Sequence, residues 1–143
     1  MKKYKDEIIG IFILIIIILF VYGSNNYTKN LRKNGRYTSC KIVDFKGYKN
    51  GPGLIFELYI NNDTFVYNGL QYGDMLKYSE MKNKYFVVRF DPLDPNKNNV
   101  LLRYELNESI ARQIDSGVST LGQILILPGV KFHEEIVNFD DGL

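Results

Sequence analysis

The chain has 143 residues, of which 45% are hydrophobic and 24% charged, and it contains one Cys and one His. This length suits one compact domain and leaves no room for two full cores. A single Cys excludes an internal disulfide, and one Cys with one His excludes the usual Cys/His zinc site. Aromatic residues suit a pleated, half-buried surface, so 11 Tyr and 9 Phe favour β-strands.

The charge is spread unevenly along the chain. Residues 1–35 hold six Lys/Arg and two acids, residues 36–104 hold ten and seven, and residues 105–143 hold two and seven. Basic residues beside an apolar segment are typical of contacts with anionic lipid headgroups. The weak positive charge of the middle segment is too dilute for a nucleic-acid-binding surface, so we expect no nucleic-acid partner.

The first element in chain order is an apolar run from Ile8 to Tyr22 without a charged side chain. Because it is apolar on all sides, it predicts a membrane-inserted helix rather than an ordinary surface helix. We expect residues 1–24 to form an N-terminal membrane anchor that contacts lipid, and residues 25–35 to form a juxtamembrane linker. At about 1.5 Å per residue the run covers about 23 Å of a hydrocarbon layer of about 30 Å, so flanking Tyr and Lys side chains are expected to extend it.

Two other interpretations of the apolar run stay open. A cleaved signal peptide has an apolar region of this length, although Asp6 and Glu7 interrupt the basic leader here. A helix in a soluble core is the other interpretation, and so uniform a run is unusual for a small domain. Abundant Lys, Asn, Ile and Tyr fit an AT-rich bacterial genome. The expected location is therefore the bacterial cytoplasmic membrane, in a single pass, with the side of the domain left open because basic residues flank both ends.

Apolar runs bounded by Gly, Pro, Asn and Asp follow, which is the pattern of successive strands. We predict a β domain over residues 36–104, with strands at 36–45, 54–60, 64–68, 85–91 and 100–104. Residues 46–53 are expected to form a loop, because Gly51-Pro52-Gly53 interrupts a ladder, and Asn61-Asn62-Asp63 a tight hairpin turn. The expected fold class is mainly β: an N-terminal transmembrane helix, then a small antiparallel sheet or partly open barrel of about five strands, with a short C-terminal helix.

The remaining segments are less regular. Residues 69–84 form a connection with helical potential around residues 75–81. Residues 105–143 are an acidic C-terminal extension, in which Asn107 is suited to cap a short helix reaching towards Asp115. The apolar residues 124–127 fit either a sixth strand or a strip lying on a membrane.

Four segments together carry a resemblance to a known kind of protein. They are Gly35 to Val43, Phe56 to Phe65, Lys84 to Pro95 with its Asp91-Pro92-x-x-Pro95 ending, and Asn98 to Leu102. In this order they resemble a family of bacterial membrane-anchored small β domains of unknown function, over residues 35–103. The resemblance implies the fold and the membrane attachment and assigns no catalytic residue.

The candidates for chemistry have ordinary structural explanations. Cys40 lies in the middle of a predicted strand, far along the chain from His133, and is expected to be a structural thiol. His133-Glu134-Glu135 lacks the second His of the zinc-protease motif. Asp91 and Asp94, joined by Asp63 or Asp74, match no calcium-loop spacing. We therefore predict no catalytic, metal or cofactor-binding residue and no enzyme.

Five tyrosines on or beside the predicted central hairpin form a possible partner surface: Tyr48, Tyr59, Tyr67, Tyr72 and Tyr78. Exposed Tyr on rigid strands makes good contact area. The alternative is that these residues only cover the outer face of the sheet and bind no partner. The function expected is a membrane-tethered, non-catalytic β module that contacts another envelope protein or peptide. The alternatives are a domain that binds a small ligand or lipid, and an immunity-type protein that neutralises a toxin at the membrane.

Overall fold

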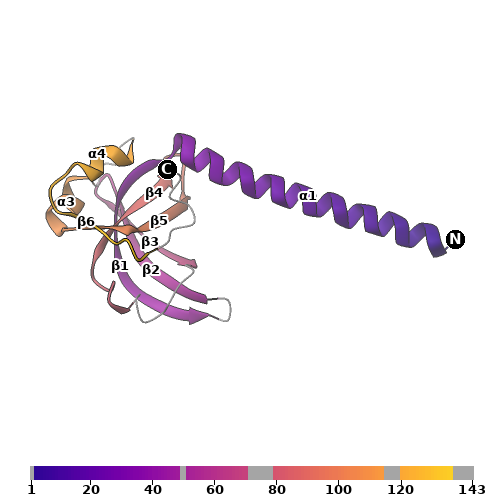
Figure 1. The fold of residues 1–143 in the computed structure, drawn as a ribbon, viewed down its shortest axis with the longest axis horizontal. Coiled ribbons are helices and arrows are strands. Elements are labelled where there is room, and N and C mark those ends of the chain that lie inside the picture. The colour runs from indigo at the N-terminus through magenta and orange to yellow at the C-terminus, as the bar shows by residue number, and fades with distance from the viewer. Residues whose placement is uncertain (1, 49–50, 71–78, 115–119, 137–143) are drawn as a thin grey trace. The chain divides into compact units, whose positions relative to one another are not determined.

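A computed structural model describes residues 2–48, 51–70, 79–114 and 120–136. The chain divides into two compact units, Met1–Asn34 and Gly35–Leu143. The first unit is the helix α1 (Lys2–Asn34), and the second is built on one antiparallel sheet (Figure 1).

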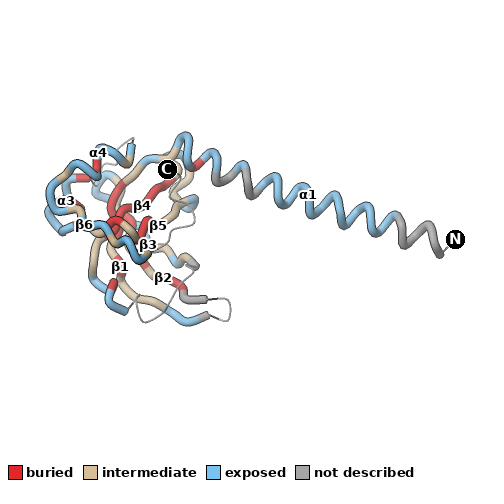
Figure 2. The backbone as a smooth tube through the Cα atoms, in the orientation of Figure 1, coloured by how far each residue is buried: buried red, intermediate tan, exposed pale blue. Residues whose placement is uncertain are grey.

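The helix predicted over the apolar run is confirmed and is longer than predicted. It starts before the run and continues without a break through the predicted linker, ending at Asn34 before Gly35. Every residue from Ile8 to Tyr22 is exposed, as the pale-blue tube of Figure 2 shows. Among the described residues, no helix combines the length and the apolarity that a membrane crossing demands. The predicted crossing is therefore not confirmed.

The sheet confirms the mainly β class and has six strands rather than about five. The strands are β1 (Arg36–Tyr48), β2 (Gly51–Ile60), β3 (Asp63–Leu70), β4 (Tyr85–Asp91), β5 (Asp94–Leu106) and β6 (Val130–Phe132). Their order in the sheet is β3-β2-β1-β4-β5-β6, and all neighbours are antiparallel. The sheet is open, with β3 and β6 at its two ends.

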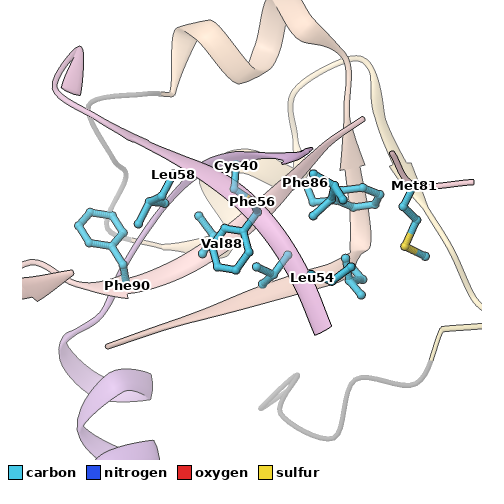
Figure 3. Close-up of a cluster of buried hydrophobic side chains, with 11 residues drawn as sticks. Cys40, Leu54, Phe56, Leu58, Met81, Phe86, Val88 and Phe90 are labelled. Atoms are coloured by element: carbon cyan, nitrogen blue, oxygen red, sulfur yellow. The ribbon is translucent and has the colours of Figure 1, made fainter. Parts of the chain in front are cut away.

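One face of the sheet carries the larger core. Side chains that alternate along β1, β2 and β4 meet there, and Phe56 and Val88 lie at the centre of the cluster between Phe90 at one end and Met81 at the other (Figure 3). Phe56 is 1% exposed and Val88 is fully buried. This alternation explains why the strand predictions were correct where apolar residues recur at every second position.

The opposite face is covered in part by two short helices, α3 (Glu108–Gln113) and α4 (Leu121–Leu125). Ile110 and Ile124 from these helices pack with Val87 and Leu101 of the sheet in a second core. The predicted Asn107 cap is confirmed, because its side-chain oxygen accepts a hydrogen bond of 2.9 Å from the backbone N–H of Ile110.

Two turns set the register of the strands. Asn61 and Asn62 have φ values of 53° and 68° and join β2 to β3, which confirms the predicted tight hairpin. A two-residue turn with positive φ at both central residues has a twist that matches the twist of the paired strands. In the β4–β5 turn the Asp91 carboxylate accepts a bond of 2.9 Å from the backbone N–H of Leu93.

Several predicted boundaries were wrong. Gly51, Pro52 and Gly53 do not form a loop but begin β2 and pair with Tyr48, Gly47 and Lys46 of β1. The fifth strand starts at Asp94 instead of residue 100. Residues 124–127 form no strand, since α4 ends among them and the sixth strand lies at residues 130–132. Most of the helix predicted around residues 75–81 lies outside the described residues.

The C-terminal segment is fixed to the sheet by close contacts. Gly129 has a φ of 102°, and a Cβ atom there would collide with the side-chain amide of Asn107. Only Gly fits such a position. Beyond it, the Arg103 Nε donates to the carbonyl of Ile136 at 2.7 Å, and the Tyr104 and Phe132 rings lie 5.6 Å apart.

Candidate binding groove

A hollow on the sheet domain lies beside α3. It has a volume of about 350 Å³ and is lined by Ser39, Tyr59, Asn62, Tyr85, Ala111 and Arg112. We call it the Tyr59–Tyr85 groove. Its residues come from three strands, the β2–β3 turn and one helix, so the assembled fold is needed to form it.

Strand register places charged residues next to the two tyrosines of the groove. Lys41 of β1 pairs with Glu57 of β2 on one side and with Tyr85 of β4 on the other. The Lys41 ammonium lies 5.7 Å from the centre of the Tyr85 ring. A cation over an aromatic face is attracted by the ring quadrupole, which holds Tyr85 in place.

The two tyrosines provide an aromatic surface with a polar edge. Their ring centres are 6.4 Å apart, with an angle of 38° between the planes. The Tyr59 hydroxyl donates to Oε2 of Glu57 at 2.7 Å. Burial, followed by the Glu57 carboxylate, raises the pKa of Tyr59 well above its usual range, so the phenol remains neutral and keeps its proton for hydrogen bonding.

The helical wall of the groove is fixed by two fully buried hydroxyl groups of β1. Ser39 donates to the carbonyl of Ala111 at 2.8 Å, and the Thr38 hydroxyl lies 2.9 Å from the carbonyl of Ile114 and 2.8 Å from that of Tyr59. Carbonyls at a helix end have no partner within the helix. These hydroxyls therefore hold the end of α3 against β1 and β2.

The outer rim of the groove is charged. Arg112 lies 2.7 Å from Glu108 one turn earlier on α3. The hydrogen bond from Arg112 lowers the pKa of Glu108, and the bond to Glu108 raises the pKa of Arg112. The groove therefore combines two aromatic rings with the Arg112 charge, and Lys41 and Glu57 contact those rings from the neighbouring positions. This combination suits polar and aromatic contacts with a peptide or small molecule.

The structure does not bring all the predicted tyrosines together. Tyr59 lines the groove, whereas Tyr67 packs against the larger core on the other face, with its ring 5.9 Å from that of Phe56. The backbone of Tyr48 lies in β1, but its side chain is outside the description, and Tyr72 and Tyr78 lie outside the described residues. Tyr85, which the sequence analysis did not select, joins Tyr59 instead.

Cys40 lies in the larger core and is fully buried. Burial raises the pKa of its thiol far above its usual range, an effect that the backbone hydrogen bond with Phe86 opposes only partly. A thiolate is the nucleophilic form, so this environment makes Cys40 unreactive. Its placement agrees with the structural thiol predicted from the sequence.

A second polar cluster was missed because its members are far apart in the chain. His133 Nε2 lies 2.7 Å from Glu105 Oε2, and His133 Nδ1 lies 3.1 Å from Glu135 Oε1. Lys84 Nζ lies 3.5 Å from the same oxygen of Glu105. The adjoining hollow of about 110 Å³ is the size of a few water molecules, so we assign this cluster to fastening the C-terminal segment to β5.

Within the described part of the chain, no group of three or more His, Cys, Asp and Glu side chains is arranged to hold a metal ion. Asp91 and Asp94 have local roles instead. Asp91 accepts from the backbone N–H of Leu93, and Asp94 accepts from the backbone N–H and the side-chain amide of Asn96.

Comparison of the chain with models of known protein families finds no match, and comparisons with curated proteins and with solved structures find none either. The resemblance to bacterial membrane-anchored β domains therefore stays a prediction.

Proposed function

We propose that this protein is a membrane-tethered, non-catalytic β module that binds another protein or a peptide. The apolar run of α1 is its membrane contact, and the Tyr59–Tyr85 groove with the adjoining face of β3 is its partner contact. The expected setting is the bacterial cytoplasmic membrane, with α1 inserted as a single pass. An immunity-type protein that neutralises a toxin would be one case of such a module.

The observation that carries the proposal is the exposure of the apolar run. Its side chains range from 48% exposed at Ile15 to 79% at Phe20. A contiguous apolar surface of this kind marks a site of contact with lipid or protein. Lipid is favoured because the run is apolar right around the helix, whereas a protein-binding helix has one apolar side. A helix also satisfies its own backbone hydrogen bonds in hydrocarbon.

Support for a protein or peptide partner comes from the groove and from β3. Tyr is enriched in the cores of protein interfaces. Thr64 pairs with Tyr59 and Val66 with Glu57, so exposed side chains of β3 continue the groove face to the end of the sheet. Val66 is 67% exposed. An extended segment lying along this face would reach both the apolar Val66 and the two tyrosine rings.

The membrane part is tested by floating the full-length chain on a density gradient with liposomes. Attachment through hydrocarbon predicts that the chain floats with the liposomes and stays with them in alkaline carbonate and in high salt. Protease digestion of sealed liposomes then distinguishes a crossing from insertion into one leaflet. Recovery of the chain in the soluble fraction, with α1 intact, would overturn the proposal.

The partner part is tested by photo-crosslinking in membranes of the native cell. A photoreactive amino acid at position 66 is compared with one at position 93, since Leu93 is 95% exposed but lies in the β4–β5 turn. We expect a discrete crosslinked product from position 66 that Tyr59→Ala together with Tyr85→Ala weakens. Identical products from both positions, or none from position 66, would contradict a partner on this face.

A small ligand is the second candidate, because a hollow of about 350 Å³ falls within the range of about 300–1,000 Å³ found for ligand pockets. Native mass spectrometry of the detergent-solubilised chain distinguishes the two. A bound small molecule that Tyr59→Ala and Tyr85→Ala remove would favour this candidate over a protein partner.

A further inference from the structure

α1 extends past its apolar run and carries three exposed basic residues there. These residues are Lys29, Arg32 and Lys33. The segment between the apolar run and Lys29, from Gly23 to Thr28, contains no charged residue. Because the chain is helical through Asn34, their spacing of three and four residues places them on one side of the helix. We call these three residues the basic patch.

The sequence around the basic patch contains no compensating acid. No Asp or Glu occurs between Glu7 and Asp44, whereas Arg36 and Lys41 add further positive charge. The other end of α1 differs, because Lys2, Lys3 and Lys5 are followed directly by Asp6 and Glu7. In the sequence, basic residues without a neighbouring acid therefore occur only on the C-terminal side of the apolar run.

The helix also sets how far the basic patch lies from the apolar run. Lys29 follows Tyr22 by about 10 Å and Lys33 by about 16 Å along a helix that rises about 1.5 Å per residue. The headgroup layer on each side of a bilayer is about 5–8 Å thick. Charges act over a Debye length of about 8 Å at physiological ionic strength. With Tyr22 at the hydrocarbon boundary and α1 near the membrane normal, the patch lies within about one Debye length of the headgroups.

We propose that the basic patch selects anionic lipids around α1. This inference rests on the proposed membrane attachment and adds the class of lipid. The occupant is the phosphate headgroup of an anionic lipid, argued from its charge complementarity with three basic side chains that a continuous helix holds next to the membrane surface. A Lys or Arg near an anionic surface strengthens the attraction by about fivefold.

The test measures which lipids surround the full-length chain. The chain is reconstituted in phosphatidylcholine vesicles with a trace of spin-labelled phosphatidylglycerol or spin-labelled phosphatidylcholine, and the motionally restricted fraction of each label is compared. We expect phosphatidylglycerol to be preferred by between about fivefold, the effect of one basic residue, and about 100-fold, the combined effect of three. The preference should vanish at about 1 M salt, where the Debye length is about 3 Å.

Two variants assign the preference to the basic patch. Lys29→Gln, Arg32→Gln and Lys33→Gln together should lower the ratio of the two labels by at least about fivefold. Lys46→Gln, Lys97→Gln and Lys131→Gln remove the same charge from exposed positions on the sheet domain and should leave the ratio unchanged. Circular dichroism confirms that both variants keep α1 and the sheet.

The outcomes separate this inference from the proposed function. A restricted signal for both lipids in equal amounts would mean that α1 is in the bilayer and that the basic patch does not select anionic lipid. An equal preference in the native chain and in the patch variant would also contradict the inference. No restricted signal for either lipid would mean that the membrane attachment itself is wrong, and the inference would fall with it.

Discussion

Two hydroxyl groups of β1 hold the end of α3 against the sheet. Ser39 and Thr38 occupy consecutive positions, and both hydroxyls meet carbonyls at the end of α3. Because α3 forms one wall of the Tyr59–Tyr85 groove, these bonds connect the packing of a short helix to the shape of the candidate site.

Removing either hydroxyl should destabilise the domain. Ser39→Ala leaves the buried carbonyl of Ala111 without its hydroxyl partner, and Thr38→Val does the same for Ile114. We expect each change to lower the free energy of unfolding by about 1–3 kcal/mol, the cost of an unsatisfied buried polar group. Urea denaturation followed by Tyr fluorescence measures it. Thr64→Val is the matched control, because Thr64 is exposed, and an equal loss in the control would contradict the assignment.

The buried thiol of Cys40 should make stability depend on pH in the alkaline range. Its folded-state pKa is raised above the usual 9.0, so the unfolded chain releases the proton first. The stabilising contribution is therefore complete below about pH 9 and decreases above it, by up to about 1.4 kcal/mol per pH unit.

This contribution is measured as the difference between the native chain and Cys40→Ala. Comparing their free energies of unfolding between about pH 8 and pH 10 cancels the titration of Lys and Tyr that both chains share. Parallel curves would show that Cys40 keeps the same pKa on folding.

At the scale of single elements, the β2–β3 hairpin depends on two asparagines in the left-handed region. A β-branched side chain tolerates positive φ poorly, so Asn61→Val should cost about 1–3 kcal/mol of unfolding free energy. Asn61→Gly is the control, because Gly adopts this conformation without strain and should leave stability nearly unchanged. Equal losses in both variants would point to a lost side-chain contact instead of backbone strain.

The elements that could be predicted from the sequence are those with a local signal. Apolar runs bounded by Gly, Pro, Asn and Asp identified β2 and β4, and Asn61-Asn62 identified the hairpin. Pro52 misled the prediction because it stands at the second residue of β2, a place where strands tolerate Pro. The three-residue β6 has no local pattern of its own and exists because it pairs with β5.

The candidate site was mostly beyond prediction for the same reason. Tyr59 was selected from the sequence, but its neighbour Tyr85 comes from a separate strand. Their proximity depends on β1 lying between β2 and β4, and on α3 docking against the sheet. Likewise Glu105 and His133 meet only because the chain returns to β5 after two short helices.

At the scale of the whole molecule, the apolar run of α1 should decide where the protein is found. Ile13→Lys and Ile17→Lys together place two charges on one side of the run, each costing about 2.5–3.5 kcal/mol in the middle of a membrane helix. We expect the double variant to move from the membrane fraction to the soluble fraction or to be degraded, as measured by cell fractionation and immunoblotting.

The control for this variant adds a charge to the sheet domain. Leu93→Lys changes a side chain that is already 95% exposed, so the partition between fractions should stay as in the native chain. Retention of the double variant in the membrane fraction would show that something other than the apolar run provides the attachment.

The terminal strand β3 has a consequence for handling the protein. Its eight residues contain no Lys, no Arg and no Pro, which are residues that commonly prevent edge strands from pairing with other chains. Phe65 and Val66 of β3 are also exposed. An edge strand without such residues promotes pairing with the edge strand of another copy at high concentration. Dilute samples, or a Lys in place of Val66, should therefore delay aggregation during purification.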